Sequence, residues 1–137
     1  MTVSIKPLQI FVFLLAILSV TNLYAADKEQ PKIQFAESSY SFGEIREDGD
    51  PVTHEFKFTN IGNAPLVIIS TSTSCGCVRV SYPHEPINPG KTSSIKVTYS
   101  PKGGFGAFIS TVKVRTNAHG NKKVNLKLSG TIKRTSK

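Results

Sequence analysis

The segment Val52–Asn60 reads VTHEFKFTN and alternates between two kinds of side chain. One face of an extended chain would hold Val52, His54, Phe56 and Phe58, and the other would hold Thr53, Glu55, Lys57 and Thr59. Because successive side chains of a β-strand point to opposite faces, this period of two predicts a strand. We therefore expect this segment to be half-buried, with the two phenylalanines facing a core.

Short segments with strand patterns recur along the chain on both sides of this one. The further predicted strands are residues 33–35, 40–45, 66–69, 77–82, 94–100, 108–116 and 123–132. Sequences rich in glycine, proline and asparagine separate most of them, and no segment shows a sustained helical period. The pattern predicts an all-β fold, an immunoglobulin-like β-sandwich of about seven to eight antiparallel strands. A small closed barrel is the alternative.

The first 25 residues have the features of a signal peptide. Lys6 precedes an apolar run over residues 8–20, and a small residue, Ala25, follows at the expected cleavage position. A membrane anchor is the alternative, but this run is shorter than the roughly 20 residues that span a bilayer. We expect an exported protein, in the periplasm or associated with the outer envelope, that is not transmembrane after cleavage.

The remaining chain is predicted to form one domain. Residues 26–32 are polar and are expected to be a flexible lead-in, residues 33–133 the domain, and residues 134–137 a basic tail. The length suffices for one modest core. With only two cysteines in the chain, packing must supply most of the stability.

Charge is distributed unevenly along the sequence. Residues 26–85 hold nine acidic and five basic side chains, whereas residues 86–137 hold eleven basic and no acidic side chains. A basic half of this kind could contact an anionic surface. Interleaving of strands from the two halves would instead dilute the asymmetry. Export and the lack of an aromatic-basic binding motif exclude nucleic acid as an expected partner.

The sequence contains none of the common catalytic motifs. It has no Gly-x-Ser-x-Gly elbow, no phosphate-binding loop and no His-Glu-x-x-His. The glycine-rich segment 103–106 lacks a surrounding βαβ unit, so it is expected to be a hairpin turn. We therefore expect no catalytic residues and a non-enzymatic binding or structural module.

Cys75-Gly76-Cys77 is the one element whose chemistry is open. Cysteines at i and i+2 place both sulfurs on one side of an extended chain. They could pack as a structural pair, reduced or oxidised, or act in thiol–disulfide exchange, or bind a soft metal. A disulfide between them would close a very small ring and would add little stability through chain entropy.

Metal binding by the cysteine pair would favour Cu(I), because thiolates are soft ligands. Zinc normally takes four protein ligands in a structural site, and only His84 offers a nearby third here. Met1 is the only methionine, which counts against a methionine-rich copper carrier. Cys75, Cys77 and His84 are thus the candidate metal ligands, Cu(I) is the one candidate metal, and otherwise no cofactor is expected.

Six stretches carry further motifs, at residues 42–45, 56–66, 74–78, 86–91, 97–103 and 114–117. Together they resemble the DUF1573 family of exported bacterial proteins, frequent in Bacteroidetes. The resemblance covers nearly all of the chain after the predicted signal peptide, from about Phe35 to Ile132. The Cys-Gly-Cys element is part of the family pattern, and this chain keeps it.

The resemblance implies a sandwich similar to major sperm protein and ASH-type domains, which serve as binding modules in larger assemblies. It implies no established activity. We expect an envelope module that contacts an unidentified protein or envelope partner through exposed sheet edges. The alternative is a periplasmic thiol–disulfide or Cu(I)-handling protein that uses Cys75 and Cys77.

Overall fold

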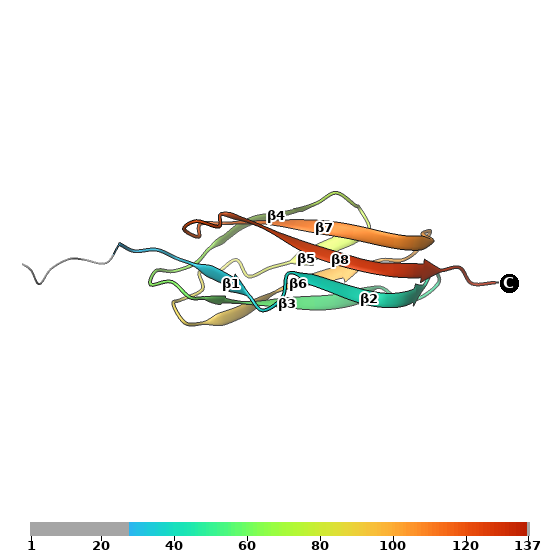
Figure 1. Cartoon of the computed structure of the whole chain (residues 1–137), viewed down its shortest axis with the longest axis horizontal. Coiled ribbons are helices and arrows are strands. Elements are labelled where there is room, and N and C mark those ends of the chain that lie inside the picture. Colours follow the sequence, from blue (N-terminus) through green and yellow to red (C-terminus); the bar gives the residue numbers. More distant parts are fainter. Residues whose placement is uncertain (1–27, 137) are drawn as a thin grey trace, which may run out of the picture.

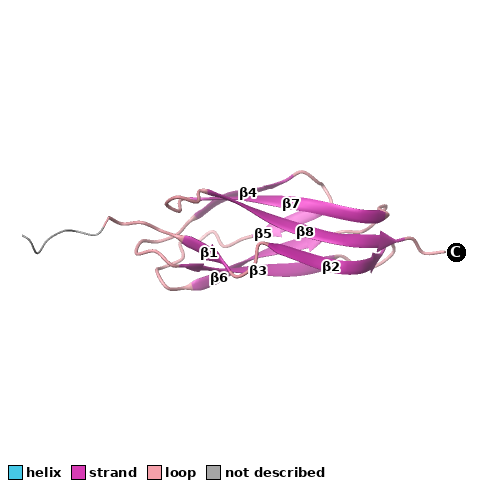
Figure 2. Cartoon of the chain, viewed as in Figure 1, coloured by secondary structure: helices cyan, strands magenta, loops and turns pink. Residues whose placement is uncertain are grey.

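The computed structural model describes residues 28–136, which form eight strands and no helix (Figures 1 and 2). The strands are β1 (Ile33–Phe35), β2 (Ser39–Arg46), β3 (Val52–Asn60), β4 (Ile68–Thr73), β5 (Val78–Ser81), β6 (Thr92–Tyr99), β7 (Gly106–Thr116) and β8 (Lys123–Lys133). The predicted all-β, immunoglobulin-like class is confirmed. The predicted signal peptide lies outside the described residues, and within them no helix has the length and apolarity needed to cross a bilayer.

Two four-stranded sheets pack face to face. The first sheet has the order β1-β3-β6-β5, and the second has the order β2-β8-β7-β4. The two sheets form the two layers of the elongated sandwich in Figure 1. This order matches the immunoglobulin arrangement, in which each sheet combines strands from distant parts of the chain.

One strand pair differs from the predicted antiparallel arrangement. β2 lies parallel to β8, with Ser39 opposite Lys127 and Arg46 opposite Lys133. The reason is that the chain crosses from the first sheet to the second between β1 and β2 without a hairpin. Because β1 and β2 are not joined by a hairpin, β2 does not pair with β1. It pairs with β8, the last strand of the chain.

The start of β4 also differs from the prediction. The sequence predicts a strand over residues 66–69, whereas β4 covers Ile68–Thr73. Leu66 instead forms an isolated antiparallel bridge with Ile87, and its side chain is fully buried. Leu66 and Ile68 of the apolar run are therefore core residues, whereas Ile69 is exposed, and the strand continues into the polar Ser/Thr sequence that follows.

The core has the alternating pattern that the sequence predicts for β3. Phe56 and Phe58 are buried, whereas the residue before each of them, Glu55 and Lys57, is exposed. The buried apolar residues form one cluster between the sheets: Phe56, Phe58, Leu66, Ile68, Val78, Ile87, Ile95, Val97, Tyr99, Val112, Val114, Ala118, Leu126, Leu128 and Ile132. Burial of this apolar surface is the main stabilising contribution.

Asn60, at the end of β3, is a fully buried polar residue. Its side-chain amide donates hydrogen bonds to the carbonyls of Ala64 (2.7 Å) and Ile87 (2.9 Å). Its side-chain oxygen accepts from the N–H groups of Gly62 (3.0 Å) and Lys32 (3.4 Å). This one side chain therefore ties together three separate chain segments.

Residues 30–32 are fixed to the same end of the sandwich. Gln30 exchanges hydrogen bonds with Asn63, and the Pro31 carbonyl accepts one from the N–H of His119. The Lys32 carbonyl accepts another from Ile61. The prediction of a flexible lead-in does not account for these contacts, which depend on partners distant in sequence.

Candidate functional site

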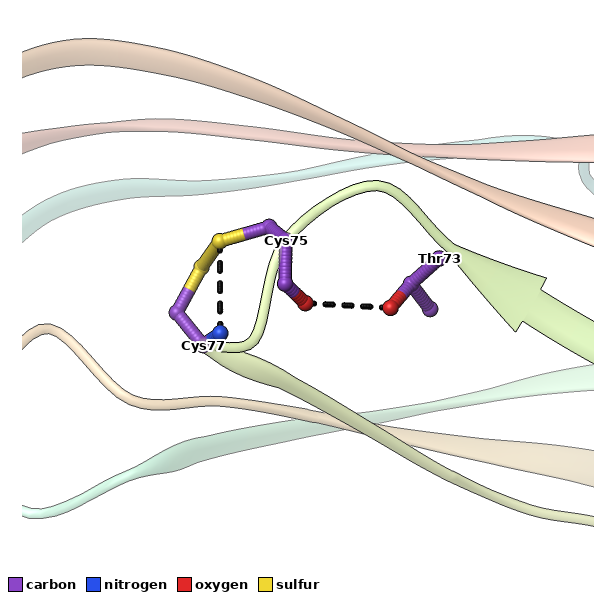
Figure 3. Close-up of a disulfide and its surroundings, with 3 residues drawn as sticks. All are labelled: Thr73, Cys75 and Cys77. Carbon is purple, nitrogen blue, oxygen red and sulfur yellow. Dashed lines mark hydrogen bonds between the residues drawn. A yellow bond between two sulfur atoms is a disulfide. The ribbon is translucent and has the colours of Figure 1, made fainter.

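The connection between β4 and β5 carries the cysteine pair. Cys75 and Cys77 are joined in a disulfide, with their Cα atoms 5.2 Å apart. Figure 3 shows the pair on the short loop that follows the β4 arrow, with Thr73 at the end of the strand. The structure therefore presents the two sulfurs as a three-residue covalent ring.

Hydrogen bonds within the loop set its shape. The Thr73 hydroxyl donates to the Cys75 carbonyl (3.0 Å), and the Cys77 N–H donates to the Cys75 sulfur (3.3 Å), as the dashed lines in Figure 3 mark. The Cys77 carbonyl accepts from the N–H of Ser100 (2.9 Å), which attaches the loop to the end of β6. The loop is thus anchored on both sides of the ring.

The inner side of the ring faces the core. Both cysteines are half-buried and pack against the apolar cluster. Next along the chain, Val78 pairs with Tyr99, whose ring stacks on Phe108 at a centroid distance of 4.0 Å. Burial of Tyr99 raises the pKa of its phenol above the ordinary value. The disulfide ring therefore packs on apolar core residues on its inner side.

The outer side of the ring faces a groove of about 640 Å³. Its lining comes from three parts of the chain: Pro51, Gly76, Cys77, Arg79, Thr98, Ser100 and Lys102. Gly76 is at the exposed tip, and a Cβ there would contact nothing within 4 Å. The groove therefore gives a partner access to the Cys77 side of the ring.

Two cations, Arg79 and Lys102, line this groove with Cys77. A cation near a cysteine favours the thiolate over the thiol when the disulfide is reduced. Arg79 is close to Cys77 in sequence, whereas Lys102 lies 25 positions after Cys77, so no local pattern links Lys102 to the cysteines. The pairing of β5 with β6 brings Lys102 to the groove beside Cys77. It places Val78 opposite Tyr99, so the turn that follows β6 lies beside the cysteines.

His84 is not brought to the cysteine pair. It follows β5, is exposed, and packs its ring against Tyr82 with the centroids 4.7 Å apart. Within residues 28–136, no three His, Cys, Asp or Glu side chains gather in a metal-binding group. With both sulfurs in the disulfide, neither presents a thiolate, so this oxidised arrangement does not fit Cu(I), for which Cys75, Cys77 and His84 were the candidate ligands.

His54, which the sequence places among core-facing residues, has a packing role. Its ring stacks on Tyr40 (3.6 Å between centroids), meets Phe56 edge-on and hydrogen bonds to Glu37. These contacts connect β3 of the first sheet with β2 of the second. No local sequence signal pairs His54 with Tyr40, because the contact depends on where the chain crosses between sheets.

Solved structures with the same fold share little sequence with this chain. A protein of unknown function from Porphyromonas gingivalis W83 superposes with a TM-score of 0.67 at 16% identity, over 80% of this chain and 51% of its own. The ASH/PapD-like domain 7 of human CEP192 gives a TM-score of 0.63 at 14% identity, over 99% of both chains. The YadV chaperone gives 0.52 at 15% identity, over 74% of this chain and 52% of its own.

These similarities establish the fold and nothing about activity, and the chain spans only about half the length of the Porphyromonas protein. No curated protein matches the sequence. The profile of the family described as "Protein of unknown function (DUF1573)" matches residues 33–132, which include the cysteine loop and all but the last residue of β8. The chain therefore belongs to the DUF1573 family.

Proposed function

We propose that this protein is an exported, non-enzymatic binding module of the bacterial cell envelope. The observation that carries the proposal is the pair of open sheet edges, β4 and β5, on either side of the cysteine loop. Each edge strand pairs on one side only, so its other side offers backbone donors and acceptors to a partner strand. The predicted signal peptide supports export.

The fold similarities support a binding role. The ASH/PapD-like domain and the YadV chaperone share this sandwich, and the latter is named as a chaperone. A chaperone acts by binding other proteins, so the fold is compatible with a module that works through contact. Fold alone does not establish function, and the edges of this chain must therefore be tested directly.

Site-specific photo-crosslinking in cells tests the proposal. A photoreactive amino acid is placed at Ser72 in β4 or at Ser81 in β5, both exposed edge positions. The matched control is Lys57, an exposed position on the central strand β3. We expect a discrete crosslinked species from an edge position and none from Lys57. Absence of any crosslink at both edges, in cells that express the protein normally, would overturn the proposal.

Thiol–disulfide exchange is a second candidate function, favoured by the groove beside Cys77 and its two cations. A partner dithiol would attack one sulfur of the ring to give a mixed disulfide. Its second thiolate would then release this chain as two thiols, so the partner is oxidised by two electrons and this chain is reduced by two. Arg79 and Lys102 would stabilise the leaving thiolate at Cys77.

An insulin-reduction assay with a small dithiol as the electron source tests this second function, because the dithiol must reduce the ring before the resulting thiols can reduce insulin. The wild type is compared with Cys75→Ser, and with Arg79→Gln and Lys102→Gln to test the cations. A redox role predicts loss of activity in Cys75→Ser and a slower rate in both charge variants. Equal rates for wild type and Cys75→Ser would remove this function and leave the binding module untouched.

A further inference from the structure

Four cations lie close together on the outward face of the second sheet. They are Lys113 and Arg115 of β7 and Lys123 and Lys127 of β8, and all four are exposed. The strand register places Arg115 directly opposite Lys123. None of the ion pairs formed among residues 28–136 includes any of the four. Their charge is therefore available to an outside anion.

The hairpin of β7 and β8 explains why this charge is not diluted. Both strands come from the acid-free part of the sequence and pair with each other along most of their length. Cations at alternate positions, such as Lys113 and Arg115, then point to the same face. On the outward face of the first sheet, in contrast, Glu55 of β3 lies opposite Lys96 of β6. On the first sheet, strands from the acidic and basic parts of the sequence lie side by side, so their charges offset one another. On the second sheet, β7 and β8 both come from the basic part, so their charges do not.

A groove runs between these cations and the edge strand β4. Its larger part, about 420 Å³, is lined by Ser70, Ser72, Lys113, Val114, Arg115, Lys123 and Asn125. A second hollow of about 160 Å³ shares Ser72 and Lys113 and extends the groove to Ser74, just after the end of β4. The small side chains of β4 leave this space open.

β4 is the edge strand best able to accept another strand. It contains only isoleucine, serine and threonine, and it is the longest edge strand without a charged side chain. Exposed edges are commonly protected by charges or bulges. β2 has charged residues and a bulge after Ser41, and β5 has Arg79. β4 carries no such charge, and its register with β7 shifts only between Ile68 and Ser70 and is regular from Ser70 to Thr73.

We propose that β4 binds an extended, acidic segment of a partner protein as a fifth strand of the second sheet. The inference rests on the proposed binding function and names the edge and the partner chemistry. An added strand would lie about 4.8 Å from β4. Every second side chain of that strand would point into the groove. Carboxylates at these positions would face Lys113 and Arg115 of β7, because the small Ser70 and Ser72 of β4 leave the space between them open.

The period of the strand defines the ligand further. Acidic side chains are required at every second position, because only those face the groove. The intervening side chains face the opposite way, toward the space between the sheets, where β-branched or apolar residues are favoured. An anionic lipid surface would bind through the cations alone. It would need neither hydrogen bonds to the backbone of β4 nor acidic groups at every second position.

Fluorescence anisotropy with the full chain, as cells produce it, tests the charge requirement. The probe is a capped ten-residue peptide that alternates glutamate and valine, and its lysine analogue is the negative control. We expect Lys113→Glu and Arg115→Glu each to weaken binding about tenfold, because a reversal replaces an attraction with a repulsion. Lys57→Glu, on the outward face of β3, makes the same charge change and should stay within about twofold of wild type.

Backbone methylation of the peptide tests the strand requirement. One peptide carries N-methyl groups on its glutamates and a second carries them on its valines. Strand addition predicts that one of these two peptides binds at least about tenfold more weakly while the other is little affected, because only alternate N–H groups face β4. Equal binding of both methylated peptides would overturn the strand model. Binding to vesicles of anionic phospholipid with no binding to the peptide would replace it with a lipid-facing surface.

Failure of this inference is distinguishable from failure of the proposed function. A crosslink at Ser81 of β5, with no binding of the acidic peptide, would overturn the β4 site and leave the binding module standing. Absence of crosslinks at either edge would overturn the module itself. Circular dichroism of the Lys113→Glu and Arg115→Glu variants confirms that lost binding does not reflect unfolding.

Discussion

The two ends of the sandwich are held together by different means. At one end, which we call the asparagine end, the buried side chain of Asn60 connects residues 32, 62, 64 and 87 through hydrogen bonds. At the other, the disulfide end, a three-residue ring sits beside an open groove. A buried polar network loses much free energy when one member is removed, whereas a small ring adds little. The asparagine end is therefore specialised for stability, which leaves the disulfide end available for contact or chemistry.

The largest effect is expected from Asn60→Ala. The substitution removes four hydrogen bonds in a fully buried position and leaves the carbonyls of Ala64 and Ile87 without this donor. We expect the free energy of unfolding to fall by about 3–4 kcal/mol. Denaturant unfolding followed by circular dichroism measures the change.

Asn125→Ala is the matched control, because Asn125 is an exposed asparagine on β8. It should change the free energy of unfolding by less than about 0.5 kcal/mol. If Asn60→Ala were as mild as this control, the asparagine end would not be the stabilising one.

The next largest effect is expected from alanine substitution of a glycine at the asparagine end, Gly62, compared with a glycine at the disulfide end, Gly76. A Cβ on Gly62 would collide with the backbone of residues 30–32, whereas a Cβ on Gly76 would meet nothing within 4 Å. We expect Gly62→Ala to cost about 2–3 kcal/mol in unfolding free energy. Gly76→Ala should be close to neutral, and equal losses in the two variants would contradict the structure.

The Gly62→Ala loss should come with a local change. Residues 30–32 must move away from the new methyl group, and the hydrogen bonds of Gln30 and Lys32 to the turn would then break. Hydrogen exchange should show faster exchange at Ile61 and Asn63 in this variant, because their N–H groups donate to that segment.

Strand positions were predictable from the sequence, because the period of two is local. The pattern of Val52–Asn60 predicted β3 with its bounds, and all eight strands were found. The parallel pairing of β2 with β8 and the end of the apolar run at β4 were not predictable in this way. Both depend on contacts between segments that are distant in sequence.

The candidate site was only partly predictable for the same reason. Cys75 and Cys77 are adjacent in sequence and were identified, but Lys102 reaches their groove only through the pairing of β5 with β6. The role of Asn60 was missed as well. An asparagine at the end of a strand, two residues before a glycine, was the available signal. The sequence placed Asn60 at the end of the predicted strand and assigned it no role, whereas the structure buries its side chain completely.

A smaller effect is expected at the disulfide end from the double variant Cys75→Ser/Cys77→Ser. Closing a loop of this size restricts the unfolded chain only slightly, so the loss of unfolding free energy should be about 1.5 kcal/mol or less. Reduction of the wild type with a strong thiol reductant should give a similar loss. A loss above about 3 kcal/mol would show that the ring is a structural staple, and the contrast between the two ends would disappear.

The smallest effect concerns Asp48, in the turn between β2 and β3. The Arg46 guanidinium donates two hydrogen bonds to its carboxylate, each 3.0 Å long, and these hold the pKa of Asp48 below its ordinary value of 3.8. A carboxyl with a lower pKa in the folded state contributes stability above the unfolded pKa, and loses it as the pH falls through the folded value. Because this side chain is exposed, the contribution to stability is small.

An NMR titration of the Asp48 carboxyl should show its midpoint rise toward the ordinary value in Arg46→Gln, whereas Lys57→Gln should leave it unchanged. An unaltered midpoint in Arg46→Gln would mean that the ion pair is not formed in solution, and the lowered pKa of Asp48 would then depend on its hydrogen bond with the Thr135 side chain.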